Sequence, residues 1–268
     1  MIRSTRQRLL ALAHYRGFVK TSIVNDVRMR FSRSNIGGLW VLLQPLAQSA
    51  IFAFVLAIVL KARLPGIDDT HAYAGYLLSG MLCWSLFMES ITKGLGLFTD
   101  NASLIKKVNF PLVTLPVIGA GISLANNVFL LLATILILAL LGYWPGKTYL
   151  LVPLLMLLTL ALGLSVGLLL GIVNVFVRDI GVVVPILLQF LFWLCPIVYS
   201  PASLPAGFRE IVLHNPLSGL IQAYQGALVF QRLPEWQWLL PSLAVAVVSL
   251  LAVRFLLRRT FAQMVDVL

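Results

Sequence analysis

The sequence predicts an all-α integral membrane protein with six transmembrane helices. Of its 268 residues, 60% are hydrophobic and only 11% are charged, whereas soluble domains average about 45–50% apolar and about 25% charged residues. The mean hydropathy is +0.97, and aliphatic runs longer than a core helix needs recur along the chain. A water-soluble fold of this size cannot bury so much apolar side chain, so we expect blocks of membrane-spanning length.

Six apolar stretches are near or above the roughly 20 residues that a helix needs to cross a bilayer. They cover residues 36–60, 72–91, 112–141, 149–176, 181–199 and 236–257. Basic residues favour cytoplasmic loops, and placing the amino terminus inside puts most of the 20 lysines and arginines there. Both termini are therefore predicted to be cytoplasmic, with a tail at 258–268. The net charge of +11 then reflects membrane topology rather than nucleic-acid binding.

The segment 1–35 precedes the six-span domain, 36–268, and is predicted to contain an amphipathic interface helix. Its apolar residues Leu12, Tyr15, Val19, Ile23 and Val27 recur at steps of three and four among basic residues. This pattern favours a helix lying among the cytoplasmic headgroups. An ordinary solvated helix has the same pattern and stays an alternative.

Two loops are too rich in structure signals to be simple connectors. The inner loop 98–111 has Asp100 and Asn101 as candidate caps and ends at Pro111, which predicts a short helix parallel to the membrane. The outer segment 200–235 contains an apolar stretch, 211–230, that is interrupted by polar residues, a proline and a glycine. It is too broken to span and too apolar to be a free loop, which favours a re-entrant helical hairpin.

The sequence offers no constellation for catalysis, for a metal or for a cofactor of its own. Cys83 and Cys195 lie in apolar segments without a CxxC pattern, and the three histidines fall in separate regions. The stretch 142–148 resembles a phosphate-binding loop, but it is one residue short and connects two spans on the outer face. We therefore predict a transport subunit that is not an enzyme and takes its ATP energy from another polypeptide.

One ionisable residue, Glu89, lies well inside a predicted span, with Lys93 one helical turn later. The order and spacing favour an ion pair within the helix. A role in transport or gating is the alternative, because charged groups inside a membrane are costly and are often functional.

The chain resembles the membrane subunits of ABC exporters for bacterial surface polysaccharides, namely O-antigen, capsule and teichoic acid. The segment 25–46 matches that family's opening pattern at Asp26, Arg28, Arg30, Ser34, Gly38, Trp40 and Pro45. The later markers follow in order and spacing: Arg178-Asp179-Ile180, the run CPIVYS at 195–200, and Asn215-Pro216-Leu217. One departure is Tyr224-Gln225, where relatives often carry an arginine after the tyrosine.

This resemblance implies a homodimer of six-span subunits that binds two copies of a cytoplasmic ABC ATPase, which holds the ATP and Mg²⁺. The complex would export a lipid-linked polysaccharide across the bacterial inner membrane. O-antigen is the first expectation for the substrate, and capsule or teichoic acid is the alternative. A secondary transporter coupled through Glu89 and a membrane-embedded transferase are the rival classes.

Three groups of functional residues are predicted. Ser103 to Pro111 is similar to the family's ATPase-docking segment, which makes these the coupling residues: Leu104, Ile105, Lys106, Lys107 and Val108. Guanidinium groups next to the first span suit the pyrophosphate of a lipid carrier, although topology signals look the same, and these are Arg28, Arg30 and Arg33. Helical spacing predicts that a sugar channel between two subunits is lined by Trp40, Gln44, Gln48, Phe52, Tyr73, Tyr76, Trp84, Phe87, Gln189, Trp193 and Tyr199.

Overall fold

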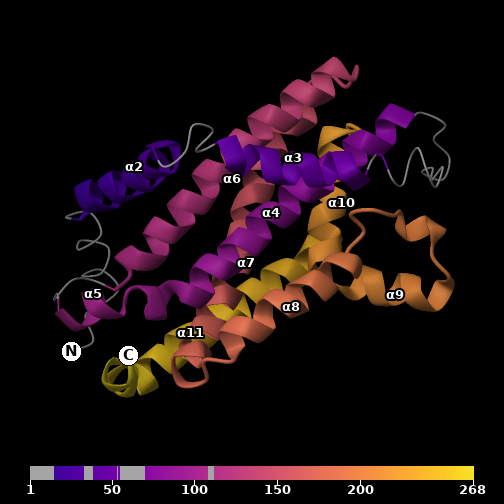
Figure 1. Ribbon diagram of the computed structural model, residues 1–268. Coiled ribbons are helices and arrows are strands. Elements are labelled where there is room, and N and C mark those ends of the chain that lie inside the picture. The colour runs from indigo at the N-terminus through magenta and orange to yellow at the C-terminus, as the bar shows by residue number, and fades with distance from the viewer. Residues whose placement is uncertain (1–14, 33–38, 53, 55–69, 108–111) are drawn as a thin grey trace.

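The computed structural model describes residues 15–32, 39–52, 54, 70–107 and 112–268, and this part of the chain is a bundle of helices without a β-strand (Figure 1). Of the helices long and apolar enough to cross a membrane, α4 packs against α6 and α7, and α11 packs against α7. The α-helices are α2 Arg16–Ser32, α3 Trp40–Phe52, α4 Thr70–Asp100, α5 Ala102–Lys107, α6 Thr114–Leu140, α7 Val152–Phe176, α8 Ile180–Trp193, α9 Ala206–His214, α10 Pro216–Leu228 and α11 Leu240–Val267. Short 3-10 helices are η3 Lys147–Leu151, η4 Pro201–Ser203 and η5 Trp236–Leu239.

Four of the predicted spans are present as helices long and apolar enough to cross a membrane. They are His71–Asp100, Thr114–Leu140, Lys147–Phe176 and Trp236–Val267. Their composition explains why the sequence predicts them, since each carries an 18-residue window with at most two charged residues. The all-helical class is therefore confirmed for the described residues, and the count of six stays a prediction.

The other two predicted spans differ from these four. The first, 36–60, is described only in part, as α3, and its remainder lies outside the described residues. The fifth, 181–199, is a helix of 14 residues that ends at Trp193, followed by a turn through Cys195 and Pro196. Proline cannot donate the backbone hydrogen bond that would continue the helix. The prediction that this helix continues to residue 199 therefore placed its end six residues too late.

The centre of the bundle is a close contact between α4 and α7, made possible by glycines on successive turns of α7. A Cβ atom on Gly163 would lie 2.8 Å from Ser90 Cβ, and one on Gly167 would lie 2.5 Å from the Ile91 carbonyl oxygen. Farther along, Gly171 faces the Gly94 backbone in the same way. Small residues at this spacing let two helix backbones approach closely, which is how helices pack when lipid supplies no hydrophobic driving force.

At the opposite end from α5, the segment between α8 and α11 forms two helices with different surroundings (Figure 1). α9 is largely exposed, whereas α10 is buried along most of its length. The helical conformation is interrupted at Asn215, between α9 and α10. The Asn215 side-chain oxygen accepts a hydrogen bond from the Leu217 amide at 3.0 Å, and Pro216 occupies the first turn of α10. The predicted pair of helices is thus present, and its depth in a membrane stays a prediction.

The amino-terminal helix and the short helix after α4 both sit near one end of the bundle (Figure 1). α2 contacts α6, where Gly121 leaves room for the Ile23 side chain. α5 packs beside the carboxy-terminal part of α11 in a second apolar cluster that includes Leu97, Phe98 and Met264. The short helix predicted between 98 and 111 is therefore present over Ala102–Lys107.

Candidate functional site

Aromatic side chains from three helices meet where α3 and α8 approach α4. Phe192 is the centre of this group: its ring stacks on Phe52 with centroids 5.6 Å apart and meets Trp84 edge-on at 5.4 Å. Trp193 contacts both Phe52 and Phe192 and has 57% of its surface exposed. The group therefore runs from the bundle interior at Trp84 to the surface at Trp193.

The structure brings several predicted lining residues together and separates others. Phe52 and Trp193 belong to this aromatic group and reach its outer edge. Trp40, Gln44 and Gln48 are also exposed on α3, as is Gln189 on α8. These side chains are available to a channel wall or to lipid.

The aromatic residues predicted to line the channel from α4 lie inside the protomer instead. Tyr73, Tyr76, Trp84 and Phe87 are all buried in the main core. Helical spacing placed them on one face, but that face packs against the protein's own chain. A channel between two subunits cannot be lined by side chains that a single subunit encloses, so their expected location requires correction.

Both tyrosines of α4 hold the irregular segment after α8. The Tyr73 hydroxyl donates to the Val198 carbonyl at 2.8 Å, and the Tyr76 hydroxyl lies 3.0 Å from the Pro196 carbonyl and 2.9 Å from the Tyr199 carbonyl. Tyr199 in turn donates to the Trp193 carbonyl at 2.9 Å. Backbone groups that lack a helix partner are satisfied here by side chains, as buried backbone must be.

Gln225 on α10 also binds the segment after α8. No role was predicted for this residue from the sequence. Its Nε2 donates to the Pro196 carbonyl at 2.9 Å, and the side chain is only 1% exposed. Asn215 reaches the same segment from the other side, 3.4 Å from the Leu194 carbonyl. The only sequence signal was the departure from the family's arginine at this position. The runs at 195–200 and 215–217 are in direct contact, because Asn215 Nδ2 also lies 3.4 Å from Cys195 Sγ.

Glu89 on α4 is hydrogen-bonded to the neighbouring helix α6. Asn126 on α6 donates to the Glu89 carboxylate at 2.6 Å. The adjacent Asn127 donates to the Leu82 carbonyl at 3.0 Å and to Ser85 Oγ at 3.2 Å. The hydrogen bond between Asn126 and Glu89 joins α4 to α6, and the predicted ion pair of Glu89 with Lys93 stays a prediction. Amides in this setting hold helices together.

The predicted coupling residues divide into an exposed part and a packed part. Lys106 and Ser103 are exposed on α5. Leu104 and Ile105 are partly buried and pack against the cluster that contains Phe98 and Met264. Their apolar side chains are thus already used inside the protomer, whereas we expected them to be free for a partner. The Lys107 side chain and Val108 lie outside the described residues.

The predicted pyrophosphate residues are described only in part. Arg28 is exposed near the carboxy-terminal end of α2. The side chain of Arg30 and all of Arg33 lie outside the described residues. Their role stays a prediction. Among the described residues, no three His, Cys, Asp or Glu side chains come together as a metal site would require.

Comparison with known proteins places the chain among transport proteins. Residues 19–229 match the family model described as "ABC-2 type transporter". The chain is 28% identical over 254 residues to the O-antigen export system permease protein RfbA of Myxococcus xanthus, covering 94% of both chains. RfbA of Klebsiella pneumoniae is 25% identical over 201 residues, 75% of both chains. The polysialic acid transport protein KpsM of Escherichia coli is 24% identical over 217 residues, which cover 79% of this chain and 81% of KpsM.

Proposed function

Since the chain belongs to the ABC-2 type transporter family, we propose that it is the membrane subunit of an ABC exporter for surface polysaccharide. The similarity to an O-antigen export permease over 94% of both chains carries this proposal. The four apolar helices long enough to cross a membrane fit it. The chain itself would form the path, and the energy would come from a separate ATPase.

O-antigen is the substrate that we favour. The O-antigen export permease of Myxococcus matches more of the chain, at higher identity, than the polysialic acid transporter does. A capsular polysaccharide or a teichoic acid is the alternative.

The ATPase would bind at the end of the bundle that carries α5. Exposed basic residues at this end are Lys106, Arg178, Arg254, Arg258 and Arg259. Lysines and arginines concentrate on the cytoplasmic side of membrane proteins, which supports a cytoplasmic α5 and a cytoplasmic carboxy terminus. We further propose six spans and a homodimer in the bacterial inner membrane, with two ATPase copies.

The polymer would pass between two copies along the face formed by α3 and α8. Trp40, Gln44 and Gln48 are exposed on α3, and Gln189 and Trp193 are exposed on α8. Sugar rings present C–H faces that pack against aromatic rings. Such contacts are weak one by one, so a chain can advance without a deep trap. Arg28, Arg30 and Arg33 would hold the carrier pyrophosphate at the start of this path.

The decisive experiment is export by purified components. The chain would be co-expressed with its candidate ATPase, reconstituted in vesicles and supplied with lipid-linked polysaccharide. We expect a stable complex and polymer translocation that needs ATP and persists when a protonophore abolishes the pH gradient. Translocation that stops with the protonophore, or stops in Glu89→Gln while ATP hydrolysis continues, would instead favour a secondary transporter.

A further inference from the structure

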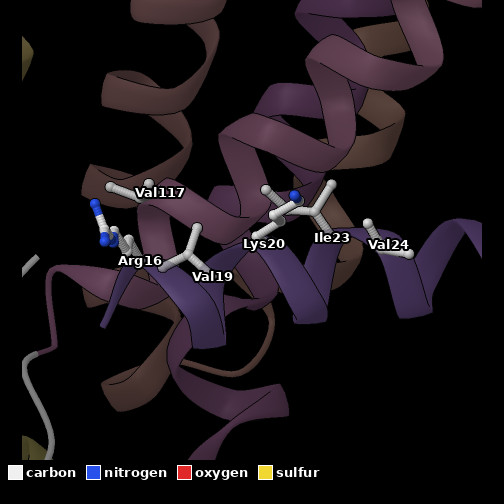
Figure 2. A pocket seen from close by; sticks show the side chains of 6 residues that line it. All are labelled: Arg16, Val19, Lys20, Ile23, Val24 and Val117. Atoms are coloured by element: carbon white, nitrogen blue, oxygen red, sulfur yellow. The ribbon is translucent and has the colours of Figure 1, made fainter. Parts of the chain in front are cut away.

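We propose that the groove between α2 and α6 is a binding site for one anionic phospholipid of the inner leaflet. The groove has a volume of about 400 Å³. It is lined by Arg16, Val19, Lys20, Ile23 and Val24 of α2 and by Val117 of α6 (Figure 2). This site is separate from the proposed polysaccharide path and rests on the proposed membrane orientation, in which α2 lies on the cytoplasmic side.

The groove lies between α2 and α6, which contact each other directly. Gly121 has no side chain, so Ile23 reaches the α6 backbone there. One turn earlier on α6, Val117 stands at the groove with 38% of its surface exposed. From there the groove extends along the apolar side chains of α2 to Arg16 in its first turn.

The charges give the site its ligand class. Arg16 and Lys20 are one helical turn apart, about 6 Å along the axis, and both line the groove (Figure 2). Both are exposed, and neither makes an ion pair or a hydrogen bond with another described side chain. Two cations at the edge of an apolar groove suit a phospholipid. Its phosphate would accept charge-assisted hydrogen bonds from Arg16 and Lys20, and its acyl chain would cover the valine side chains.

The position along α2 favours an ordinary membrane lipid over the polysaccharide carrier. Arg28 lies 12 residues after Arg16, which is about 18 Å along a helix. A single pyrophosphate cannot bridge that distance. The groove and the residues proposed for the carrier would therefore bind two different molecules.

The test measures lipid retention by the full-length protein, with phosphatidylglycerol and phosphatidylcholine as probes. Native mass spectrometry of the detergent-purified chain should show one phosphatidylglycerol retained at a concentration where phosphatidylcholine is lost. The double variant Arg16→Gln, Lys20→Gln should bind phosphatidylglycerol about tenfold more weakly. The matched control Arg254→Gln, Arg258→Gln removes two exposed cations with the same spacing from α11 and should leave retention unchanged.

A second pair of variants tests the apolar half of the site without changing charge. Val117→Trp should fill the groove and displace the lipid. Val128→Trp is its control, because Val128 is 40% exposed and lies on nearly the same face of α6 three turns away. Both variants should elute as folded protein.

The proposal fails if the wild type retains both lipids equally, or if the charge variant matches its control. It also fails if the two tryptophan variants lose lipid to the same extent. A soluble analogue of the polyprenyl pyrophosphate that displaces phosphatidylglycerol at equal concentration would identify the groove as a carrier site and overturn the assignment to a membrane phospholipid.

Discussion

At the residue scale, one carbonyl group shows how the irregular segment after α8 is kept in place. The Pro196 oxygen accepts from Gln225 Nε2 on α10, and the Tyr76 hydroxyl on α4 lies within hydrogen-bond distance of both the Pro196 and the Tyr199 carbonyls. A buried carbonyl with two lone pairs can use both donors, and losing the last one exposes it to the full cost of desolvation. Side chains from two helices, α4 and α10, thus provide hydrogen-bond donors for one backbone oxygen.

This arrangement predicts a non-additive response. Gln225→Leu should reduce the free energy of unfolding by about 1 kcal/mol, since Tyr76 stays in place, and Tyr76→Phe should reduce it more, because the Tyr199 carbonyl also loses its donor. The double variant should lose more than the sum of the two, because the carbonyl then has no partner. Thermal unfolding in detergent, followed by tryptophan fluorescence, measures all three.

Gln222→Leu is the control for the Gln225 substitution. Its Nε2 donates only to the Ser218 carbonyl of the same helix, at 3.2 Å. Its unfolding temperature should stay close to that of the wild type. Strict additivity of the Tyr76 and Gln225 variants would mean that the two donors act independently.

At the element scale, the backbone contact of α4 with α7 makes glycine substitutions severe. Gly167→Leu should abolish folded protein, because its side chain would meet the Ile91 backbone, and overpacking of this kind costs at least about 1–3 kcal/mol. Gly207→Leu on the exposed α9 should be tolerated, since no atom lies within 4 Å of its added Cβ. The yield of monodisperse protein in gel filtration compares the two variants. Equal yields would show that the helices are not in contact at Gly167.

For the short helix α5, we expect a substitution that weakens binding of the ATPase without affecting folding. Lys106→Glu should reduce co-purification of the ATPase at least fivefold, since the proposed role of Lys106 is to attract the ATPase by its charge. The unfolding temperature should stay unchanged, because Lys106 is exposed. Arg209→Glu, which is exposed on α9 at the other end of the bundle, should leave co-purification intact. If both substitutions weaken the complex equally, α5 is not the docking element.

Substitution of Leu104 and Ile105 by Asp should weaken the complex and also lower the unfolding temperature. Both side chains pack against the protein's own apolar cluster, and burying an unpaired carboxylate there is costly. A variant that releases the ATPase with normal thermal stability would show that these residues serve the partner alone.

At the scale of the whole molecule, composition was a better guide than helical spacing. Four long spans followed from apolar length, since nothing in a soluble core requires such runs. The position of Tyr76 and Trp84 did not follow, because every face of a membrane helix is apolar and the sequence does not say which face meets protein. The end of α8 at Trp193 was missed because the residues after it are as apolar as the helix itself.

The proposed path predicts a pattern of chemical accessibility across the complex. Single cysteines at Gln44, Gln48 and Trp193, which are exposed, should react with a water-soluble thiol reagent during ATP-driven export, and cysteines at the buried Trp84 and Phe87 should not. The native Cys83 and Cys195 are buried and should give a low background. Equal protection of both sets during export would place the path elsewhere.

The glycine contact between α4 and α7 also has a mechanical consequence. α4 has 31 residues and no proline, so it extends about 46 Å without a hinge, and α7 braces it along Gly163, Gly167 and Gly171. α5 follows the carboxy-terminal end of α4. Near the amino-terminal end of α4, Tyr73 and Tyr76 make hydrogen bonds to the segment 196–199. If the ATPase displaces α5, α4 would therefore tilt as a rigid body, and the segment 196–199 at its other end would move with it.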